Sequence, residues 1–223
     1  MASGEWPFEA QDRRVASKKP PIGGYVLAGG ASSRFGADKA LALLDGKTML
    51  ARMCELVRNV AANVLVVGAQ SKYEGEGTEV MEDLWPGEGP LGGIITALMA
   101  TGESPNRCDW NLIVSCDMPF LTAEWLRYLA ERALKSPASV VVPRSREGLE
   151  PLCACWRTSA TGKLQYAFAD GVRKVTEAMK HLEMEILDEA HWKRFDNAGR
   201  LFWNMNTPQD YESAQKAMEE ERQ

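Results

Sequence analysis

Short apolar runs alternate along the chain with segments in which apolar residues recur every three or four positions. The runs are rich in β-branched residues and are bounded by glycine, proline or polar residues, a pattern typical of buried strands. The periodic segments predict amphipathic helices, because residues three and four apart share one helix face. We expect strands at 22–28, 63–68, 111–115, 139–143 and 151–156.

Residues that favour helix starts mark the helical segments. Thr48 is a suitable N-cap for a helix with apolar positions between 50 and 60, and Thr122 for one that contains Trp125 and Leu129. Thr207 is followed by a proline and then an acid at the third position, which predicts the start of a C-terminal helix. A further helix is expected over 92–100.

This alternation predicts an α/β protein with a mostly parallel central sheet covered by helices on both faces, a three-layer α/β/α arrangement. We expect one domain over 22–223, preceded by a flexible N-terminal arm at 1–21 that lacks periodicity. In such sheets, ligands bind beyond the carboxyl ends of the strands. The loops that follow the predicted strands are therefore the first place to look for a site.

Composition and charge exclude several function classes. The 223 residues are 45% hydrophobic with a formal net charge of −5, which argues against a nucleic-acid partner that would need a basic stripe. No apolar stretch reaches spanning length, so we expect a cytoplasmic protein without a membrane partner. The five cysteines lack metal-ligand spacing and are expected to be reduced, and two histidines leave little for a histidine-centred site.

Two glycine motifs are misleading. Gly46-Lys47-Thr48 ends like a Walker A loop, but Leu41 stands where that loop needs its first glycine, so a turn and a helix cap are the better interpretation. The segment GEGPLG at 87–92 fits the dinucleotide pattern GxGxxG. It comes too late in the chain and follows a proline-containing stretch, so we reject it as a dinucleotide fingerprint.

The informative motif is LAGGASSRFGADK at 27–39, directly after the first predicted strand. Gly29 and Gly30 let the backbone approach a ligand closely and present N–H groups to phosphate oxygens. Arg34 offers a planar fork for phosphate, and Lys39 a mobile ammonium. A polar surface loop would not require this combination, so the motif favours a phosphate-binding loop.

The same motif resembles the signature loop of the nucleotidyltransferases related to molybdenum cofactor guanylyltransferase, the MobA-like family. Other family motifs are similar to segments in the same order, and the likeness covers about residues 22–215. These segments are EGPLGGI at 88–94, SCDMPFL at 115–121, EPLCAC at 150–155 and FWNMNTP at 202–208.

The resemblance implies a Rossmann-like nucleotidyltransferase fold that uses GTP and Mg²⁺ to transfer GMP to molybdopterin. It assigns catalytic roles to Arg34, Lys39 and Asp117, with Asp117 as the metal ligand. It implies a nucleotide site formed by Leu27, Ala28, Gly29, Gly30, Lys39, Asp83 and Asp117.

The chemistry of the carboxylates agrees with this. Asp117 ends a buried strand just before a proline, and Mg²⁺ binds one or two carboxylates together with phosphate oxygens. Thr122 is a better helix cap than Asp117. Asp83 lies in an irregular acidic stretch, and only the resemblance makes it a nucleotide ligand rather than a solvated acid.

The acceptor side of the site is less defined by the sequence. Asn204 and Asn206 present amides on one side of an extended segment, and Asn206 can either hold substrate or cap the following helix. Arg144 and Arg173 are candidates for the anionic pterin substrate. Arg146 and Lys174 are further candidates, although each of the four can equally be an ordinary surface charge.

One departure from the family concerns the loop after the second strand. Gly68-Ala69-Gln70 replaces the family's Asn-Ala-Asn, which places any amide contact from that loop in doubt unless Gln70 substitutes.

Other functions fit the same residues. A cytidylyltransferase for molybdopterin or a sugar-phosphate nucleotidyltransferase would keep the fold. A non-catalytic module that delivers nucleotide or cofactor is the alternative of another class, but it would not need Arg34, Lys39 and Asp117 together. The family resemblance also implies cofactor-insertion proteins or molybdoenzyme chaperones as partners.

Overall fold

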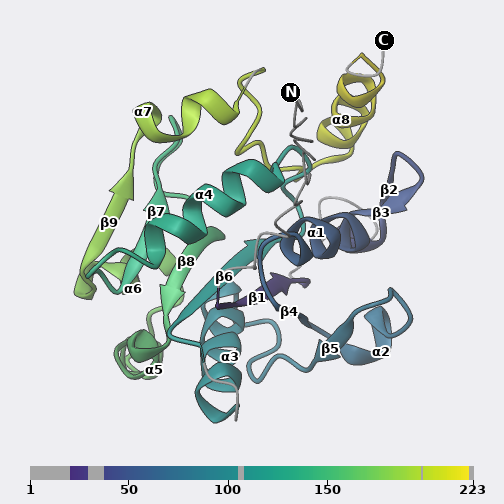
Figure 1. The fold of residues 1–223 in the computed structure, drawn as a ribbon. Helices are drawn as coiled ribbons and strands as arrows, with labels where there is room; N and C mark the ends of the chain where they lie inside the picture. The colour runs from purple at the N-terminus through teal and green to yellow at the C-terminus, as the bar shows by residue number, and fades with distance from the viewer. Residues whose placement is uncertain (1–20, 30–37, 105–107, 197, 221–223) are drawn as a thin grey trace, which may run out of the picture.

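The computed structural model describes residues 21–29, 38–104, 108–196 and 198–220 (Figure 1). In this part of the chain, seven strands form one central sheet with helices on both faces. Apart from Pro21, the expected arm lies outside the described residues. None of the helices described is long and apolar enough to cross a membrane.

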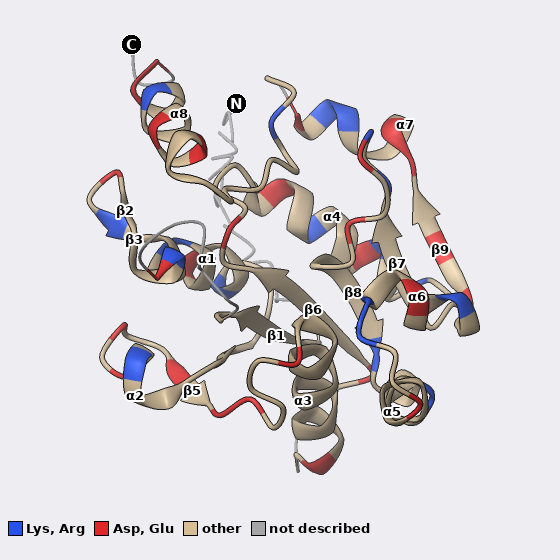
Figure 2. Cartoon of the chain, turned by 180° about the vertical axis from the view of Figure 1, so that it is seen from behind, with Lys and Arg blue, Asp and Glu red and all other residues tan. Residues whose placement is uncertain are grey.

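The strands of the central sheet follow the order β5-β4-β1-β6-β8-β7-β9. Only β8 runs against its neighbours, β6 and β7, and the other adjacent pairs are parallel, so the mostly parallel sheet is confirmed. Figure 2 shows that the central strands β1 and β6 carry no charged side chain, as strands buried on both faces require. The strands are β1 (Ile22–Leu27), β4 (Asn63–Val67), β5 (Glu79–Met81), β6 (Trp110–Ser115), β7 (Val140–Pro143), β8 (Cys153–Arg157) and β9 (Met184–Leu187).

Two apolar cores lie on opposite faces of this sheet. Val26 and Leu112 belong to the core under α1 and α4, whereas their neighbours Tyr25 and Ile113 belong to the core under α3 and α5. Successive strand residues point to opposite faces, so one apolar run supplies both cores. The three-layer arrangement is thereby confirmed. The helices that form the layers are α1 (Met49–Arg58), α4 (Ala123–Ala133), α3 (Pro90–Glu103), α5 (Thr161–Ala169) and α6 (Val175–Ala178).

The C-terminal helix α8 (Pro208–Glu220) packs outside these layers, beside α1 and the hairpin of β2 (Leu43–Leu44) and β3 (Lys47–Thr48) (Figure 1). A third cluster of Leu44, Met49, Met205 and Ala214 joins helix and hairpin. The C-terminal helix is thereby attached to the hairpin and to the start of α1.

The predicted helix caps are confirmed. The Thr48 hydroxyl accepts a hydrogen bond from the Ala51 N–H, and the Thr122 hydroxyl accepts one from the Trp125 N–H. The Walker-like segment is a hairpin turn, in which the Lys47 ammonium pairs with the Glu55 carboxylate at 2.8 Å, so a turn and a helix cap are confirmed there.

Several short elements do not follow from the hydrophobic pattern. The helix expected over 92–100 begins earlier, at Pro90, and the strand expected from 151 begins at Cys153. The pattern misses the sheet edges β5 and β9, the helices α5 and α6, and the single-turn helices α2 (Gln70–Tyr73) and α7 (Glu189–Trp192).

The strand order reverses between β1 and β6. The chain runs from β1 to β4 on one side and returns to place β6 on the other side of β1. In open α/β sheets, the crevice outside the carboxyl ends at such a reversal is the place where ligands bind. The segments that follow β1 and β6 lie there.

Gly68, at the end of β4, is packed against the segment that follows β1. A Cβ at this position would lie 2.2 Å from the Ala28 carbonyl oxygen and 2.9 Å from the Tyr73 ring. Ala28 is held there because its N–H donates to the Val67 carbonyl at 2.9 Å. A larger residue at 68 would therefore displace the start of the glycine-rich loop.

We predict that Gly68→Ala lowers the free energy of unfolding by about 1–3 kcal/mol, the usual effect of overpacking a close contact. Gly162→Ala is the control, because Gly162 lies in α5 with no atom within 4 Å of an added Cβ. There, alanine should stabilise by about 0.5–1 kcal/mol. Urea unfolding of the two variants checks both signs, and a Gly68→Ala protein as stable as the parent would contradict the packing argument.

Candidate functional site

The predicted phosphate-binding residues follow β1, at the sheet reversal. Leu27 and Ala28 are buried, and Gly29 is exposed with φ at +146°, a conformation that favours glycine. Among the described residues, no atom lies within 4 Å of a Cβ built on Gly29, so none of them covers its backbone. Gly30 and Arg34 lie outside the described residues.

Asp38 fixes the far end of this loop. One carboxylate oxygen accepts from the Ala40 N–H at 3.1 Å, and the other accepts from the Tyr73 hydroxyl at 2.9 Å, with Lys72 Nζ at 3.6 Å. Burial and the adjacent Asp38 carboxylate raise the pKa of Tyr73, which keeps its hydroxyl a donor. Asp38 was not among the expected site residues, although it precedes Lys39 in the motif.

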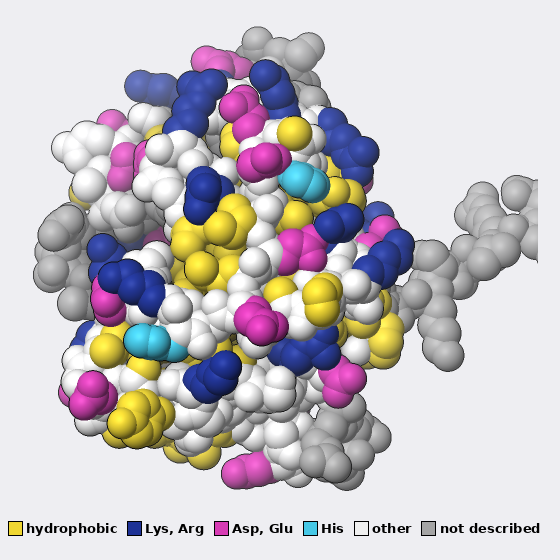
Figure 3. All heavy atoms as spheres, turned by 90° about the vertical axis from the view of Figure 1, so that its left-hand side faces the viewer, with side chains coloured by type: hydrophobic (Ala, Val, Ile, Leu, Met, Phe, Trp, Pro, Cys, Tyr) yellow, Lys and Arg dark blue, Asp and Glu magenta, His cyan; other side chains and the backbone are white. Residues whose placement is uncertain are grey.

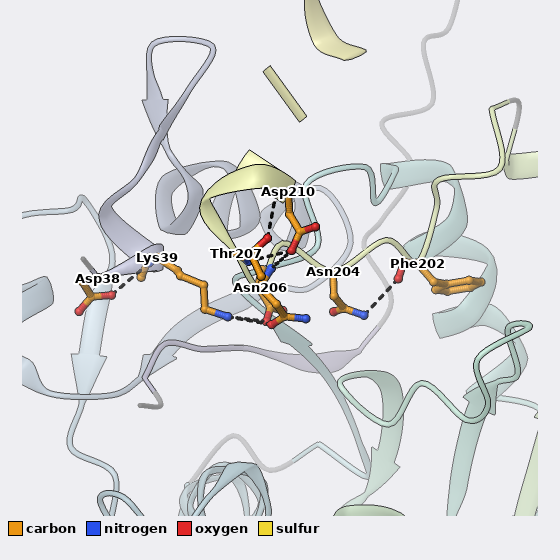
Figure 4. A network of polar contacts seen from close by, with 9 residues as sticks. Asp38, Lys39, Phe202, Asn204, Asn206, Thr207 and Asp210 are labelled. Atoms are coloured by element: carbon orange, nitrogen blue, oxygen red, sulfur yellow. Dashed lines mark hydrogen bonds and ion pairs between the residues drawn. The ribbon is translucent and has the colours of Figure 1, made fainter. Parts of the chain in front are cut away.

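Lys39 is the centre of a polar cluster that joins three distant parts of the chain. Its ammonium lies 3.5 Å from the Asp117 carboxylate. It also donates to the Asn206 side-chain carbonyl at 3.0 Å, the contact drawn in Figure 4. The Lys39 and Asp117 side chains are only 20% and 18% exposed. The structure therefore brings together Lys39, Asp117 and Asn206, which the sequence analysis had proposed for phosphate, metal and acceptor.

Asp117 has the free lone pairs that a cation ligand needs. Its Oδ1 is buried without a hydrogen-bond partner, while Oδ2 faces Lys39. A carboxylate oxygen buried in this state is costly unless a cation or a substrate group pairs with it. No group of three acidic, histidine or cysteine side chains suited to a metal occurs among the described residues. Asp117 therefore fits a Mg²⁺ ion that takes its other ligands from phosphates and water.

The segment before α8 holds this cluster from the C-terminal side. The Met205 N–H donates to the Asp117 backbone carbonyl at 2.9 Å. Asp210 accepts from the N–H groups of Asn206 and Thr207, and the Asp210 N–H donates to the Thr207 hydroxyl (Figure 4). Thr207 therefore caps α8, as the motif predicts, and the alternative that Asn206 is the cap is wrong.

Asn204, the other amide of this motif, does not join the cluster. Its side-chain N–H donates to the Phe202 carbonyl at 3.2 Å within its own loop, and Figure 4 shows it beside Asn206. Its assignment to substrate stays a prediction.

Asp83 supports the start of α3. One of its carboxylate oxygens accepts from the Trp85 N–H at 3.0 Å and from the Thr96 hydroxyl at 3.1 Å. The other carboxylate oxygen lies 3.9 Å from where a Cβ would be at Gly93, so the acid packs beside the first turn of the helix. A nucleotide contact of Asp83 stays a prediction.

The basic candidates are spread over other elements. Arg173 is paired with Glu88 at 2.6 Å and lies over the Phe168 ring at 3.9 Å, so its charge ties α5 to the loop before α3. Arg144 and Lys174 are exposed, and Lys174 is the residue that precedes α6. Arg146 borders a cavity of about 350 Å³.

The loop that departs from the family pattern, Gly68-Ala69-Gln70, leads into a short helix. Gln70 begins α2, and its backbone N–H donates to the Glu82 carboxylate at 2.8 Å.

Glu150 is a buried acid near this site to which the sequence analysis assigned no role. The Ser145 hydroxyl donates to its carboxylate at 2.5 Å. Burial raises the pKa of Glu150, Ser145 lowers it, and the negative charges of Glu147 and Asp117 raise it further. Its place at the start of the EPLCAC motif is the feature of the sequence that could have marked it as a site residue.

The cysteines have no place in the site chemistry. Cys54, Cys116, Cys153 and Cys155 are buried and outside any disulfide, as expected. Burial raises the pKa of Cys153 to about 12, with a smaller opposing effect of the Trp125 indole N–H. These thiols therefore pack as neutral apolar groups.

Comparisons with known proteins agree with this geometry. The chain matches the family described as "MobA-like NTP transferase domain" over residues 24–184. A protein named "Molybdenum cofactor guanylyltransferase" from Desulfosudis oleivorans is 31% identical, in a match that covers 88% of this chain and 96% of that protein.

Solved structures share the fold. Molybdopterin-guanine dinucleotide biosynthesis protein A from Archaeoglobus fulgidus has a TM-score of 0.77 at 25% identity, and the match covers 89% of this chain and all of that one. Rv0371C from Mycobacterium tuberculosis H37Rv was solved in complex with manganese. It has a TM-score of 0.62 at 18% identity, with 88% and 98% of the two chains covered, which shows a shared fold.

Proposed function

This chain belongs to the family of MobA-like NTP transferase domains, and we propose that it transfers GMP from GTP to the terminal phosphate of molybdopterin. The observation that carries the proposal is the contact of Lys39 with both Asp117 and Asn206 at the sheet reversal. The family membership agrees with the resemblance of the motifs and with the nucleotidyltransferase fold.

The name of the Desulfosudis relative supports guanine and molybdopterin as the substrates, because the match extends over nearly all of both chains. The product of such a reaction is a guanine dinucleotide form of the molybdenum cofactor. Cofactor-insertion proteins or molybdoenzyme chaperones would receive that product.

In the proposed reaction, an oxygen of the molybdopterin phosphate attacks the α-phosphorus of GTP in line with the bond to the β-phosphate. A new P–O bond forms, the bond to the β-phosphate bridging oxygen breaks, and pyrophosphate leaves with the bonding electrons. A phosphate monoester is already an anionic nucleophile near neutral pH, so the chain needs no general base. Positioning and charge stabilisation are then the main contributions of the protein.

The described residues can supply both contributions. The exposed backbone at Gly29 lets a triphosphate approach the end of β1. Asp117 and Asn206 hold the Lys39 ammonium at the carboxyl edge of the sheet, where we propose that it binds an oxygen of the α- or β-phosphate. Gly30 and Arg34 are proposed to complete the phosphate loop, as the motif implies.

Asp117 is the residue we propose for the Mg²⁺ ion, because its Oδ1 is buried and unpartnered. When bound, the ion would neutralise charge that develops on the phosphate oxygens. Asp117 also keeps Lys39 at the carboxyl edge of the sheet before substrate arrives.

We predict that GTP with Mg²⁺ raises the melting temperature of the full chain more than ATP, CTP or UTP. At a hundredfold excess over Kd, the ligand should add about 2.7 kcal/mol of stability. For a protein of this size, that corresponds to roughly 5–10 °C. Differential scanning fluorimetry with the four nucleotides checks this, and a series led by CTP would instead assign the chain as a cytidylyltransferase.

We predict that Asp117→Asn lowers pyrophosphate release in the presence of molybdopterin, GTP and Mg²⁺ by two to three orders of magnitude. This is about 2.7–4 kcal/mol of lost transition-state stabilisation. GTP binding without metal should persist or strengthen, because the change removes a negative charge beside the triphosphate. Pyrophosphate release and calorimetric GTP titration of the same preparation check both parts.

Asp170→Asn is the matched control for this variant, because Asp170 is an exposed acid at the end of α5. Its turnover should equal that of the parent. If Asp117→Asn kept the parental rate and magnesium dependence, the metal assignment would be wrong. A parent that binds GTP tightly but releases no pyrophosphate with molybdopterin would favour the non-catalytic module.

A further inference from the structure

A cavity of about 350 Å³ lies apart from the Lys39 cluster, between the loop after β7, helix α7 and the segment before α8. Trp192, Phe202 and Trp203 contribute aromatic rings to its lining, and Arg146, Glu147 and Glu189 contribute charged groups. Cavities of this size that combine aromatic walls with a few polar groups are typical of small-molecule sites. No residue of this set has a part in the phosphate chemistry described above.

The cavity lies at the same edge of the sheet as the proposed nucleotide site. Arg146 follows β7 and Glu189 follows β9, and both strands run parallel to each other. The strand β8 runs antiparallel to both β6 and β7, so β6 and β7 share a direction. The carboxyl ends of β6, β7 and β9 therefore lie at one edge, where ligands of α/β sheets bind.

A short segment connects the cavity to the Lys39 cluster. Trp203 lines the cavity, whereas Asn206, three residues later, accepts the hydrogen bond from Lys39. Three residues span at most roughly 10 Å. Trp203 also stacks on Phe120 at a centroid distance of 5.5 Å, and Phe120 belongs to the loop that carries Asp117. One molecule can therefore reach both places if it carries a ring at one end and a phosphate at the other.

The lining favours a heteroaromatic ring with neighbouring N–H donors. Aromatic side chains stack on flat rings, and a carboxylate accepts two parallel N–H bonds. A 2-amino-4-oxo-pyrimidine edge presents such a pair of donors, and Glu147 and Glu189 are carboxylates at the cavity. The indole N–H of Trp192 is already bonded to the Arg144 carbonyl at 3.0 Å, so its ring is fixed in place.

The surrounding surface agrees with a neutral polar ring rather than a polyanion. The face of the molecule that carries β9 and α7 mixes acidic, basic and apolar side chains (Figure 3). Glu189 lies 3.5 Å from Lys193, which balances part of the acidic charge.

We propose that this cavity binds the pterin ring of the acceptor, with the acceptor phosphate directed along residues 203–206 toward Lys39. The inference rests on the proposed function, since that function supplies an acceptor with a ring and a terminal phosphate. It adds a location and a recognition chemistry for the ring. Trp203 and the two carboxylates determine acceptor specificity in this arrangement.

Guanine has the same 2-amino-4-oxo edge as a pterin, so GTP is the other source of this chemistry. The proposed phosphate loop follows β1, whereas the cavity lies beyond β6, on the side of β7 and β9. We assign the cavity to the pterin because the acceptor phosphate must approach GTP from the side opposite its leaving group. Pterin and GTP then bind at the same time.

The test is a titration of the full chain with 6-carboxypterin, followed by the fluorescence of the pterin, without and with saturating GTP and Mg²⁺. Saturable binding with a Kd that changes less than twofold when GTP is present supports the proposal. Displacement of the pterin by GTP would assign the cavity to the guanine base and overturn it. A parent that binds GTP but shows no saturable pterin binding would overturn it as well.

Variants locate the site. Trp203→Leu keeps apolar bulk against Phe120 and should weaken pterin binding about tenfold, with GTP affinity unchanged. Tyr166→Leu is the matched control, because Tyr166 is 78% exposed on α5 and outside the cavity, and it should bind pterin like the parent. Parental pterin affinity in Trp203→Leu would overturn the proposal.

Variants of the two exposed carboxylates provide a second measurement, because these changes leave the packing of the protein intact. Glu147→Gln or Glu189→Gln should weaken 6-carboxypterin at least fivefold, and parental affinity in both would overturn the recognition of the donor edge. The proposed function is tested separately, because a parent that binds no nucleoside triphosphate would refute that function whatever the pterin result.

Discussion

The contact between Lys39 and Asp117 is the interaction on which the arrangement of this site depends. The two residues are 78 positions apart in sequence, and they meet because β1 and β6 are neighbours at the point where the strand order reverses. Both side chains are mostly buried, so neither charge is well solvated. A pair of this kind contributes little to folding stability, because desolvation offsets the attraction. Its value is that it holds a cation and a buried carboxylate oxygen at an edge open to ligands.

The C-terminal segment completes this arrangement from a third direction. Met205 binds the Asp117 backbone, and Asn206 accepts from Lys39, while Asp210 fixes the backbone of Asn206. The apolar cluster of α8 with the β2–β3 hairpin anchors the segment. Within this segment, Trp203 lines the aromatic cavity and Asn206 contacts Lys39. A single segment therefore sets the distance between the proposed ring and phosphate positions of the acceptor.

The sequence predicts the interior strands and the capped helices because their signals are local. Thr48, Thr122 and Thr207 cap the helices they precede, and the runs at β1 and β6 are largely apolar and carry no charged residue. The antiparallel direction of β8 and the edge strands β5 and β9 were not predicted. Strand direction depends on the path of the whole chain, and edge strands are short and partly polar. The contact of Asn206 with Lys39 spans 167 positions, so no local pattern could reveal it.

The central claim is that Lys39, held in place by Asp117 and Asn206, binds the phosphates of GTP, and a double-mutant cycle of Lys39 and Asn206 on GTP affinity tests it most directly. Calorimetric titration of Lys39→Ala, Asn206→Ala and the double variant gives the coupling between the two side chains. The account predicts that Asn206→Ala weakens GTP binding several-fold in the parent and has no further effect once Lys39 is alanine. Additive losses in the double variant would show that Asn206 contacts the ligand independently, and would contradict the account.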